Sequence, residues 1–202
     1  MLLKNQREDF AQYQTIAGVD EAGRGPLAGP VVVAAVILDH AAPIADLNDS
    51  KKLTARKRET LFQQICQQAL AYKIISVPPE KIDQINILQA TLWGMEEAVL
   101  NLDLAPQICL IDGNQLPPRI ANISEAIVKG DSKYASNASA SILAKVYRDR
   151  IMLQLHATYP QYNFAANKGY PTPQHLQAIR KFGITPSHRR SYKPVQQYTF
   201  DF

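Results

Sequence analysis

The stretch TIAGVDEAGRGPLAGPV, residues 15–31, joins a short apolar strand pattern to two adjacent carboxylates and a glycine-arginine-glycine turn. Residues 16–19 predict a buried strand, and Asp20 and Glu21 follow where that strand gives way to the turn. Side chains alternate along a strand, so neighbouring acids normally point apart. A position at the strand end could aim both at one ligand, and Gly23 and Gly25 would let the backbone approach it. The alternative is a solvated strand end followed by an ordinary turn.

The glycines do not form a nucleotide-binding loop. The dinucleotide pattern G-x-G-x-x-G must open a helix, but Gly29 comes one position late and Pro26 lacks an N–H. The next residues, VVVAAVIL (31–38), return to a strand pattern, and no G-x-x-x-x-G-K-[ST] motif occurs. The turn is better suited to presenting peptide groups and Arg24 to a sugar-phosphate.

Composition indicates one globular domain. The 202 residues are 46% hydrophobic and 20% charged, which suffices for a core and argues against disorder. A formal net charge of +4 favours an anionic partner, although weakly. The N-terminus is charged, and the longest apolar run, residues 31–38, is too short to span a bilayer. The two cysteines have no C-x-x-C spacing. These features predict a cytoplasmic protein that is not attached to a membrane. We expect a monomer.

The order of elements predicts an α/β fold. Strands are expected at residues 16–19, 31–38, 72–77, 107–111 and 125–128. Helices are expected from a Thr54 cap to residue 70 and at residues 87–102, 135–155 and 174–182. We expect a catalytic part over residues 1–158 and a helical, basic, substrate-contacting segment of the same domain over residues 159–202.

Two further acids follow strand patterns: Asp112 and Asp131. Ligands of open α/β sheets gather at the carboxyl ends of strands, so four carboxylates would converge if these strands are neighbours. Such a cluster requires a compensating cation, and oxygen ligands alone favour Mg²⁺ or Mn²⁺, two of which can clamp a phosphodiester. Singly, Asp112 could begin a turn and Asp131 could cap a helix.

Basic and aromatic residues flank these acids. Lys51, Lys168 and Arg189 belong to a larger set of cations near the acidic loops or in the C-terminal segment, of which about half are expected to be merely solvated. Tyr170 lies in the loop NKGYPTPQH, residues 167–175. An aromatic ring held there could stack on a sugar or base, or it could be an ordinary packed tyrosine.

Seven motifs together resemble type 2 ribonuclease H, ribonuclease HII. They are GVDEAGRGPLAGPV, LNDSKKL, LIDGN, VKGDS, ASILAKV, NKGYPT and HRRSY, which occur in order across nearly the whole chain. The resemblance implies a ribonuclease H-like mixed five-stranded sheet flanked by helices. It implies an endonuclease that cleaves RNA in RNA–DNA hybrids. It also implies cutting on the 5′ side of single ribonucleotides in duplex DNA, leaving 3′-hydroxyl and 5′-phosphate ends.

The resemblance also implies residue roles. Asp20, Glu21, Asp112 and Asp131 would bind two divalent ions, Gly23, Arg24 and Gly25 would sense the 2′-hydroxyl, and Tyr170 would read the RNA–DNA junction. Two alternatives remain open at this point. One is a non-catalytic hybrid-binding module, and the other is a metal-dependent phosphatase or nuclease acting on other substrates.

The chain ends in QYTFDF, from Gln197 to Phe202, where a glutamine precedes aromatics at alternate positions. In an extended segment these aromatics would share one side and fit a hydrophobic groove. The pattern looks like the glutamine-led peptides that bind bacterial sliding clamps. The alternative is that the aromatics anchor the end of the chain to its own body.

Overall fold

The centre of the molecule is a five-stranded mixed sheet. The structure is a computed structural model, and it describes residue 3 and residues 6–198. The strands are β1 Ile16–Ala22, β2 Val31–Leu38, β3 Ala69–Val77, β4 Ile108–Asp112 and β5 Ser124–Ile127, in the order β3-β2-β1-β4-β5. β2 is antiparallel to β1 and β3, whereas β4 is parallel to β1 and β5. The predicted mixed five-stranded sheet is confirmed.

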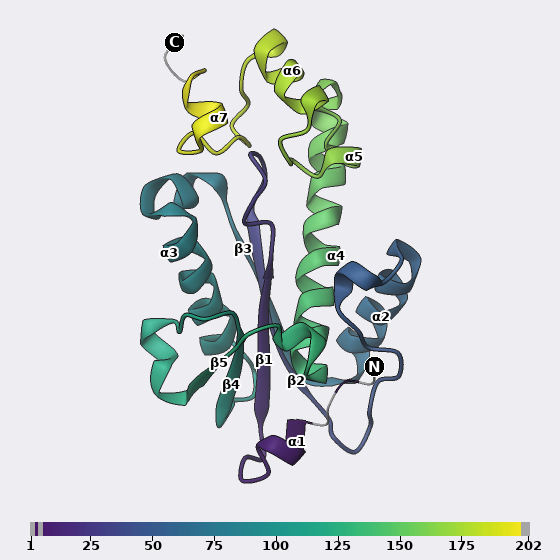
Figure 1. Ribbon diagram of the computed structural model, residues 1–202. Coiled ribbons are helices and arrows are strands. Elements are labelled where there is room, and N and C mark those ends of the chain that lie inside the picture. The colour runs from purple at the N-terminus through teal and green to yellow at the C-terminus, as the bar shows by residue number, and fades with distance from the viewer. Residues whose placement is uncertain (1–2, 4–5, 199–202) are drawn as a thin grey trace.

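Helices cover both faces of the sheet (Figure 1). Helix α3 Pro79–Leu100 lies on one face, and α2 Ala55–Gln68 and α4 Ala135–Thr158 lie on the other. The shorter helices are α1 Gln6–Asp9, α5 Phe164–Asn167, α6 Pro173–Phe182 and α7 Lys193–Gln196, with 3-10 turns η1 Ser50–Lys52, η2 Pro118–Ile123, η3 Gly130–Ser132 and η4 Pro160–Tyr162. Within the described ranges, no helix combines the length and the apolar character needed to cross a bilayer.

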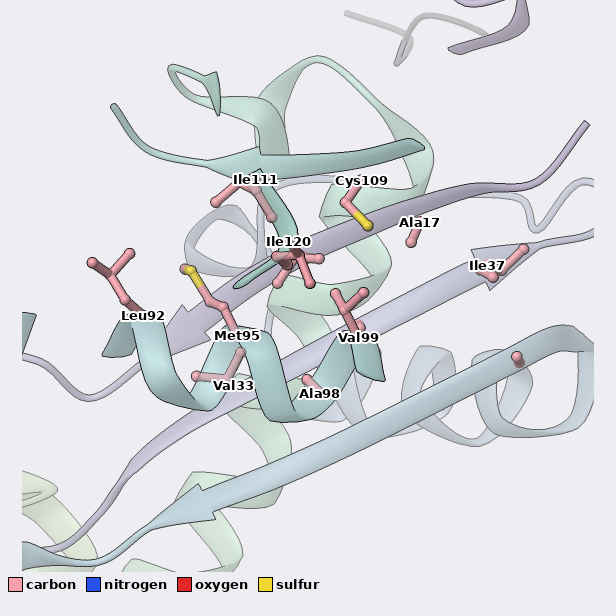
Figure 2. Packing of buried hydrophobic residues seen from close by; sticks show 13 residues of the cluster. Ala17, Val33, Ile37, Leu92, Met95, Ala98, Val99, Cys109, Ile111 and Ile120 are labelled. Carbon is pink, nitrogen blue, oxygen red and sulfur yellow. The ribbon is translucent and has the colours of Figure 1, made fainter. Parts of the chain in front are cut away.

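The core explains why β2 has no polar residue. All eight of its side chains are buried because helices cover both faces of the strand. Figure 2 shows Met95 and Val99 of α3 packed toward Val33 of β2 and Ile111 of β4. Each fully buried large apolar side chain stabilises the fold by about 1.5–3 kcal/mol. This packing holds the central strands β1 and β4 in fixed relative positions.

The boundary between α2 and β3 differs from the prediction. Thr54 caps α2 as expected, because its side chain accepts a hydrogen bond from the Lys57 N–H. The helix ends at Gln68 rather than residue 70, and Ala69 already adopts an extended conformation and pairs with Leu38. Pairing with a strand about thirty residues earlier overrides local helix propensity here.

Helix α3 begins earlier than predicted and has a break. It starts at Pro79, and Asn86 interrupts it with φ 66° and ψ 165°. The Asn86 side chain accepts a hydrogen bond from the Gln89 N–H at 3.1 Å, so it caps the part of α3 that follows. The predicted start at residue 87 thus corresponds to this second part.

Residues after α4 form most of a smaller core, the C-terminal core, at one end of the sheet. Met152 near the end of α4 packs with Tyr162, Phe164, Ile179 and Val195, and Leu27 and Ala28 from the β1–β2 connection join this cluster. In Figure 1 the β1–β2 connection extends toward α5, α6 and α7. The C-terminal segment therefore packs directly on the turn that follows β1.

Candidate active site

Three aspartates meet at one edge of the sheet. Because β1, β4 and β5 run parallel, their carboxyl ends lie at the same edge. Asp20 lies in β1, Asp112 ends β4 and Asp131 lies in η3 after β5. Each offers a carboxylate oxygen, and these oxygens lie within 4.8 Å of one another. The expected convergence of these three acids is confirmed.

Glu21 lies apart from this group. The prediction that β1 ends at residue 19 is wrong, because the strand continues to Ala22 through pairing of Ala22 with Val32. Asp20 and Glu21 therefore remain in a pleated strand and face opposite sides of the sheet. Asp20 points toward Ser141 of α4, whereas Glu21 lines a pocket on the α3 side. The pocket also includes Asp112, so Glu21 reaches the same edge from the other face.

Backbone and side-chain donors position the aspartates. The Gly130 N–H donates to Asp112 Oδ1 at 3.0 Å. Asn137 of α4 donates through Nδ2 to the carbonyl of Leu110 at 2.7 Å and to that of Val19 at 3.3 Å. Asn137 thus joins β1 and β4 within two residues of their acids, which keeps Asp20 and Asp112 close together.

The cluster carries an excess of negative charge. Burial, followed by repulsion from Glu21 and Asp112, raises the pKa of Asp20 well above its usual value. Burial is also the main cause that raises the pKa values of Glu21 and Asp112. A divalent cation would offset this repulsion, and three converging carboxylates are the ligands that Mg²⁺ and Mn²⁺ prefer. The residues present therefore fit a hard divalent ion.

The two predicted lysines lie in different places. Lys51 Nζ is 3.9 Å from Asp131 Oδ2. Partial burial acts to lower the pKa of Lys51, but the carboxylates, Asp131 first, raise it. Lys168 instead has Asp149 and Lys145 as its electrostatic neighbours, and burial lowers its pKa. The structure brings Lys51, but not Lys168, to the acidic cluster.

The glycine-arginine-glycine turn lies beside Tyr170. Gly23 has φ +97°, a backbone conformation that side chains with a Cβ rarely adopt. Arg24 and Gly25 are exposed, and Arg24 Nη1 is 3.4 Å from Glu21 Oε1. A Cβ atom added at Gly25 would lie 3.4 Å from Cε1 of Tyr170, whose side chain is 46% exposed. Residues 23–25 and 170 thus form one surface, although they are far apart in the sequence.

Several polar residues at this site are buried, which the sequence did not predict. Ser141 bonds to Asp20, and its hydroxyl lies 2.9 Å from that of Ser50. Arg148 and Arg189 are also buried, at 1% and 0% exposure. The composition of the segment ASNASAS at the start of α4 could have indicated buried polar residues, since serine and asparagine are unusual at buried helix positions. Nothing local distinguishes the two arginines from surface cations.

Comparison with known proteins agrees with this geometry. Residues 17–195 match the family described as Ribonuclease HII. A ribonuclease HII of Marinomonas sp. (strain MWYL1) is 55% identical over 182 residues, which cover 90% of this chain and 92% of that protein. Ribonuclease H2 from Pyrococcus horikoshii OT3 superposes with a TM-score of 0.78 at 30% identity, covering 92% of this chain and 97% of that one.

A further similar structure is the PCNA:RNase HII complex from Archaeoglobus fulgidus. Its TM-score is 0.73 at 28% identity, and the match covers 89% of this chain and 95% of that one. The family match spans most of the chain and includes all three converging aspartates. The chain therefore belongs to the ribonuclease HII family of endoribonucleases.

Proposed function

We propose that this endoribonuclease hydrolyses RNA in RNA–DNA hybrids and cuts on the 5′ side of single ribonucleotides embedded in duplex DNA. The cut would leave 3′-hydroxyl and 5′-phosphate ends. One observation carries the proposal: the turn of Gly23 to Gly25 continues the strand that holds Asp20, and its Gly25 lies against Tyr170. A surface able to examine a sugar is thus fixed relative to the acids.

The family is dependent on divalent metal, and we assign Asp20, Glu21, Asp112 and Asp131 as ligands of two ions, Mg²⁺ or Mn²⁺. When bound, such ions supply activation of the attacking water and stabilisation of the leaving oxygen. The chain itself fixes the ligands: the Gly130 N–H orients Asp112, and Ser141 orients Asp20. Glu21 approaches from the α3 face and completes the set of four acids.

The remaining residues would select and hold the substrate. Peptide groups of the turn Gly23 to Gly25, in which Arg24 and Gly25 are exposed, can hydrogen-bond the 2′-hydroxyl, the group that distinguishes RNA from DNA. The Tyr170 ring would pack against the next sugar and favour a deoxyribose, which has no 2′-hydroxyl. Lys51 and Lys168 would contact phosphates, Lys51 near the acids and Lys168 farther along the duplex.

A gel assay tests this activity. A DNA duplex with one ribonucleotide and a label at its 5′ end is incubated with Mg²⁺ or with a chelator. We expect a single cut before the ribonucleotide, only with Mg²⁺, and a product that a DNA polymerase can extend from its 3′-hydroxyl. An all-DNA duplex of the same sequence should remain intact. Equal cutting of that duplex would favour a general nuclease, and binding without cutting would favour a non-catalytic module.

We also propose that residues 197–202 contact a sliding clamp. The support is the glutamine-led aromatic pattern and the similar structure of the PCNA:RNase HII complex from Archaeoglobus fulgidus. Residues 199–202 lie outside the described residues, whereas Tyr198 packs against the C-terminal core. A peptide of residues 197–202 should bind a bacterial clamp, and a scrambled peptide should not. No binding at about millimolar peptide, a free energy near −4 kcal/mol, would exclude the clamp.

A further inference from the structure

Two buried arginines hold the backbone around the glycine-arginine-glycine turn. Arg189 donates through Nη2 to the carbonyl of Gly23 at 2.6 Å, through Nη1 to that of Arg24 at 2.8 Å, and through Nε to that of Gly29 at 3.0 Å. Arg148 makes three similar bonds, to the carbonyls of Ala28, Pro30 and Lys168 at 3.0–3.1 Å. Neither guanidinium forms a salt bridge with a described residue.

Burying an unpaired charge is costly unless its hydrogen bonds are made. Here backbone carbonyls, rather than a carboxylate, satisfy each guanidinium. Arginines are almost never fully buried without a partner. An arginine that only formed an ion pair at the surface would not need three backbone acceptors. The bonds of Arg189 therefore indicate a role in fixing the backbone that supplies the carbonyls.

The orientation of these carbonyls determines which groups the turn presents. A trans peptide unit is planar, with its C=O and N–H pointing in opposite directions. The carbonyls of Gly23 and Arg24 point inward to Arg189, so the N–H groups of Arg24 and Gly25 in the same peptide units point away from it. Both residues are exposed, and neither N–H has an acceptor among the described residues.

We propose that Arg189 is a positioning residue for ribose recognition. It fixes two successive peptide planes so that the N–H groups of Arg24 and Gly25 stand ready to donate to the 2′-oxygen. This inference rests on the proposed role of the turn in sensing the 2′-hydroxyl. Preorganised donors cost no rearrangement on binding, and hydrogen bonding of their carbonyls to a cation strengthens them as donors.

Tyr192 and Gly23 fit the same role. The Tyr192 hydroxyl donates to the Arg24 carbonyl at 2.6 Å and accepts from Arg189 Nη1 at 3.0 Å, so it supports the same peptide plane. A Cβ atom at Gly23 would lie 1.9 Å from Nε of Arg148, so only glycine at this position allows the turn to pack against Arg148. A lysine could not replace Arg189, because one ammonium cannot reach three separate carbonyls.

Equilibrium binding in a chelator tests the proposal without hydrolysis. Fluorescence anisotropy gives Kd for a duplex with one ribonucleotide and for the matching all-DNA duplex, and their ratio is the sugar preference. The variants are Arg189→Lys and Tyr192→Phe. Ile65→Ala serves as the control, because Ile65 is a fully buried core residue of α2 and its apolar side chain cannot hydrogen-bond the turn. Thermal melting shows that each variant is folded.

We expect wild type to prefer the ribonucleotide duplex by about tenfold, the value of one or two hydrogen bonds. Arg189→Lys should reduce this preference to about twofold or less, and Tyr192→Phe should reduce it by about threefold. Ile65→Ala should lower the melting temperature and keep the wild-type preference. If Arg189→Lys does not fold, Tyr192→Phe alone decides.

A wild-type preference in Arg189→Lys and Tyr192→Phe would overturn the positioning role while leaving the turn as the sensor. No preference in wild type would instead remove the turn from sugar sensing, and this inference with it. The cleavage proposal would then still be judged by the gel assay. An equal loss of preference in Ile65→Ala would show that the effect is a general consequence of instability, and it would also overturn the inference.

Discussion

Acid should destabilise this protein through His188, which lies in the C-terminal core at 1% exposure. Its Nδ1 accepts from the Thr185 N–H at 2.9 Å, and its Nε2 is 3.2 Å from Nε2 of His175. Nδ1 of His175 lies 2.9 Å from the carbonyl of Tyr170 and must carry a proton to bond it. Both rings are therefore assigned as neutral, with His188 donating to His175, and together they hold the Tyr170 loop.

The loss of free energy of unfolding in acid follows from the pKa of His188. Burial, and then the neighbouring His175, lowers this pKa from 6.5 to about 3. Between these two values the unfolded ring binds a proton and the folded ring does not. The stability that the neutral ring confers is thus complete above pH 6.5 and is lost as the pH falls toward 3. From about pH 7.5 to about pH 5 the loss is about 2 kcal/mol.

Urea denaturation at a series of pH values measures this loss. The His188→Gln variant cannot titrate there, so its free energy of unfolding should fall by about 2 kcal/mol less than that of wild type over this interval. Phe164→Leu is the matched control: it disturbs the same cluster without removing a titrating group, and its pH slope should equal that of wild type. If His188→Gln also keeps the wild-type slope, the buried neutral ring is not the cause.

Three other substitutions have defined outcomes. Asp112→Asn should abolish cleavage while leaving hybrid binding intact or stronger, since it removes a charge that repels phosphate. The exposed Asp103→Asn is the control. Turnover of Asp112→Asn above about a tenth of wild type under saturating Mg²⁺ would contradict the assignment of Asp112 as a metal ligand. Tyr170→Ala should cost about 1–3 kcal/mol on single-ribonucleotide substrates and less on long hybrids, measured as kcat/KM; equal losses would remove Tyr170 from junction reading. Gly18→Ala should destabilise the fold severely in thermal melting, because its Cβ would lie 2.2 Å from the backbone of α4. Gly25→Ala, whose Cβ would meet only the Tyr170 ring at 3.4 Å, should melt close to wild type, and similar melting of the two variants would refute the packing argument.

The sequence predicted the sheet and the meeting of three aspartates because both depend on simple patterns. Apolar runs identify the strands, and parallel neighbours bring Asp112 and Asp131 to one edge. The division of Asp20 from Glu21 could not be predicted in the same way. It follows from pairing of Ala22 with Val32, which extends the pleat of β1 beyond both acids. That pairing depends on the tertiary structure rather than on local propensity.

The buried arginines show a second limit of sequence reasoning. In the sequence, Arg189 belongs to a basic segment and resembles the other cations near the acidic loops. Its burial depends on three carbonyls about 160 residues earlier in the chain. A satisfied guanidinium of this kind can be identified only when the positions of its acceptors are known.

The long separation between the turn and Arg189 has a consequence for protein synthesis. Residues 16–131 supply the sheet and its acids, but Arg189, which bonds the carbonyls of the turn, is translated well after them. While residues 187–189 remain inside the ribosomal tunnel, the nascent chain cannot make these bonds, although its earlier strands are free to pair. Selectivity for the sugar would therefore be acquired later in translation than the sheet, after the strands that carry the acids have begun to pair.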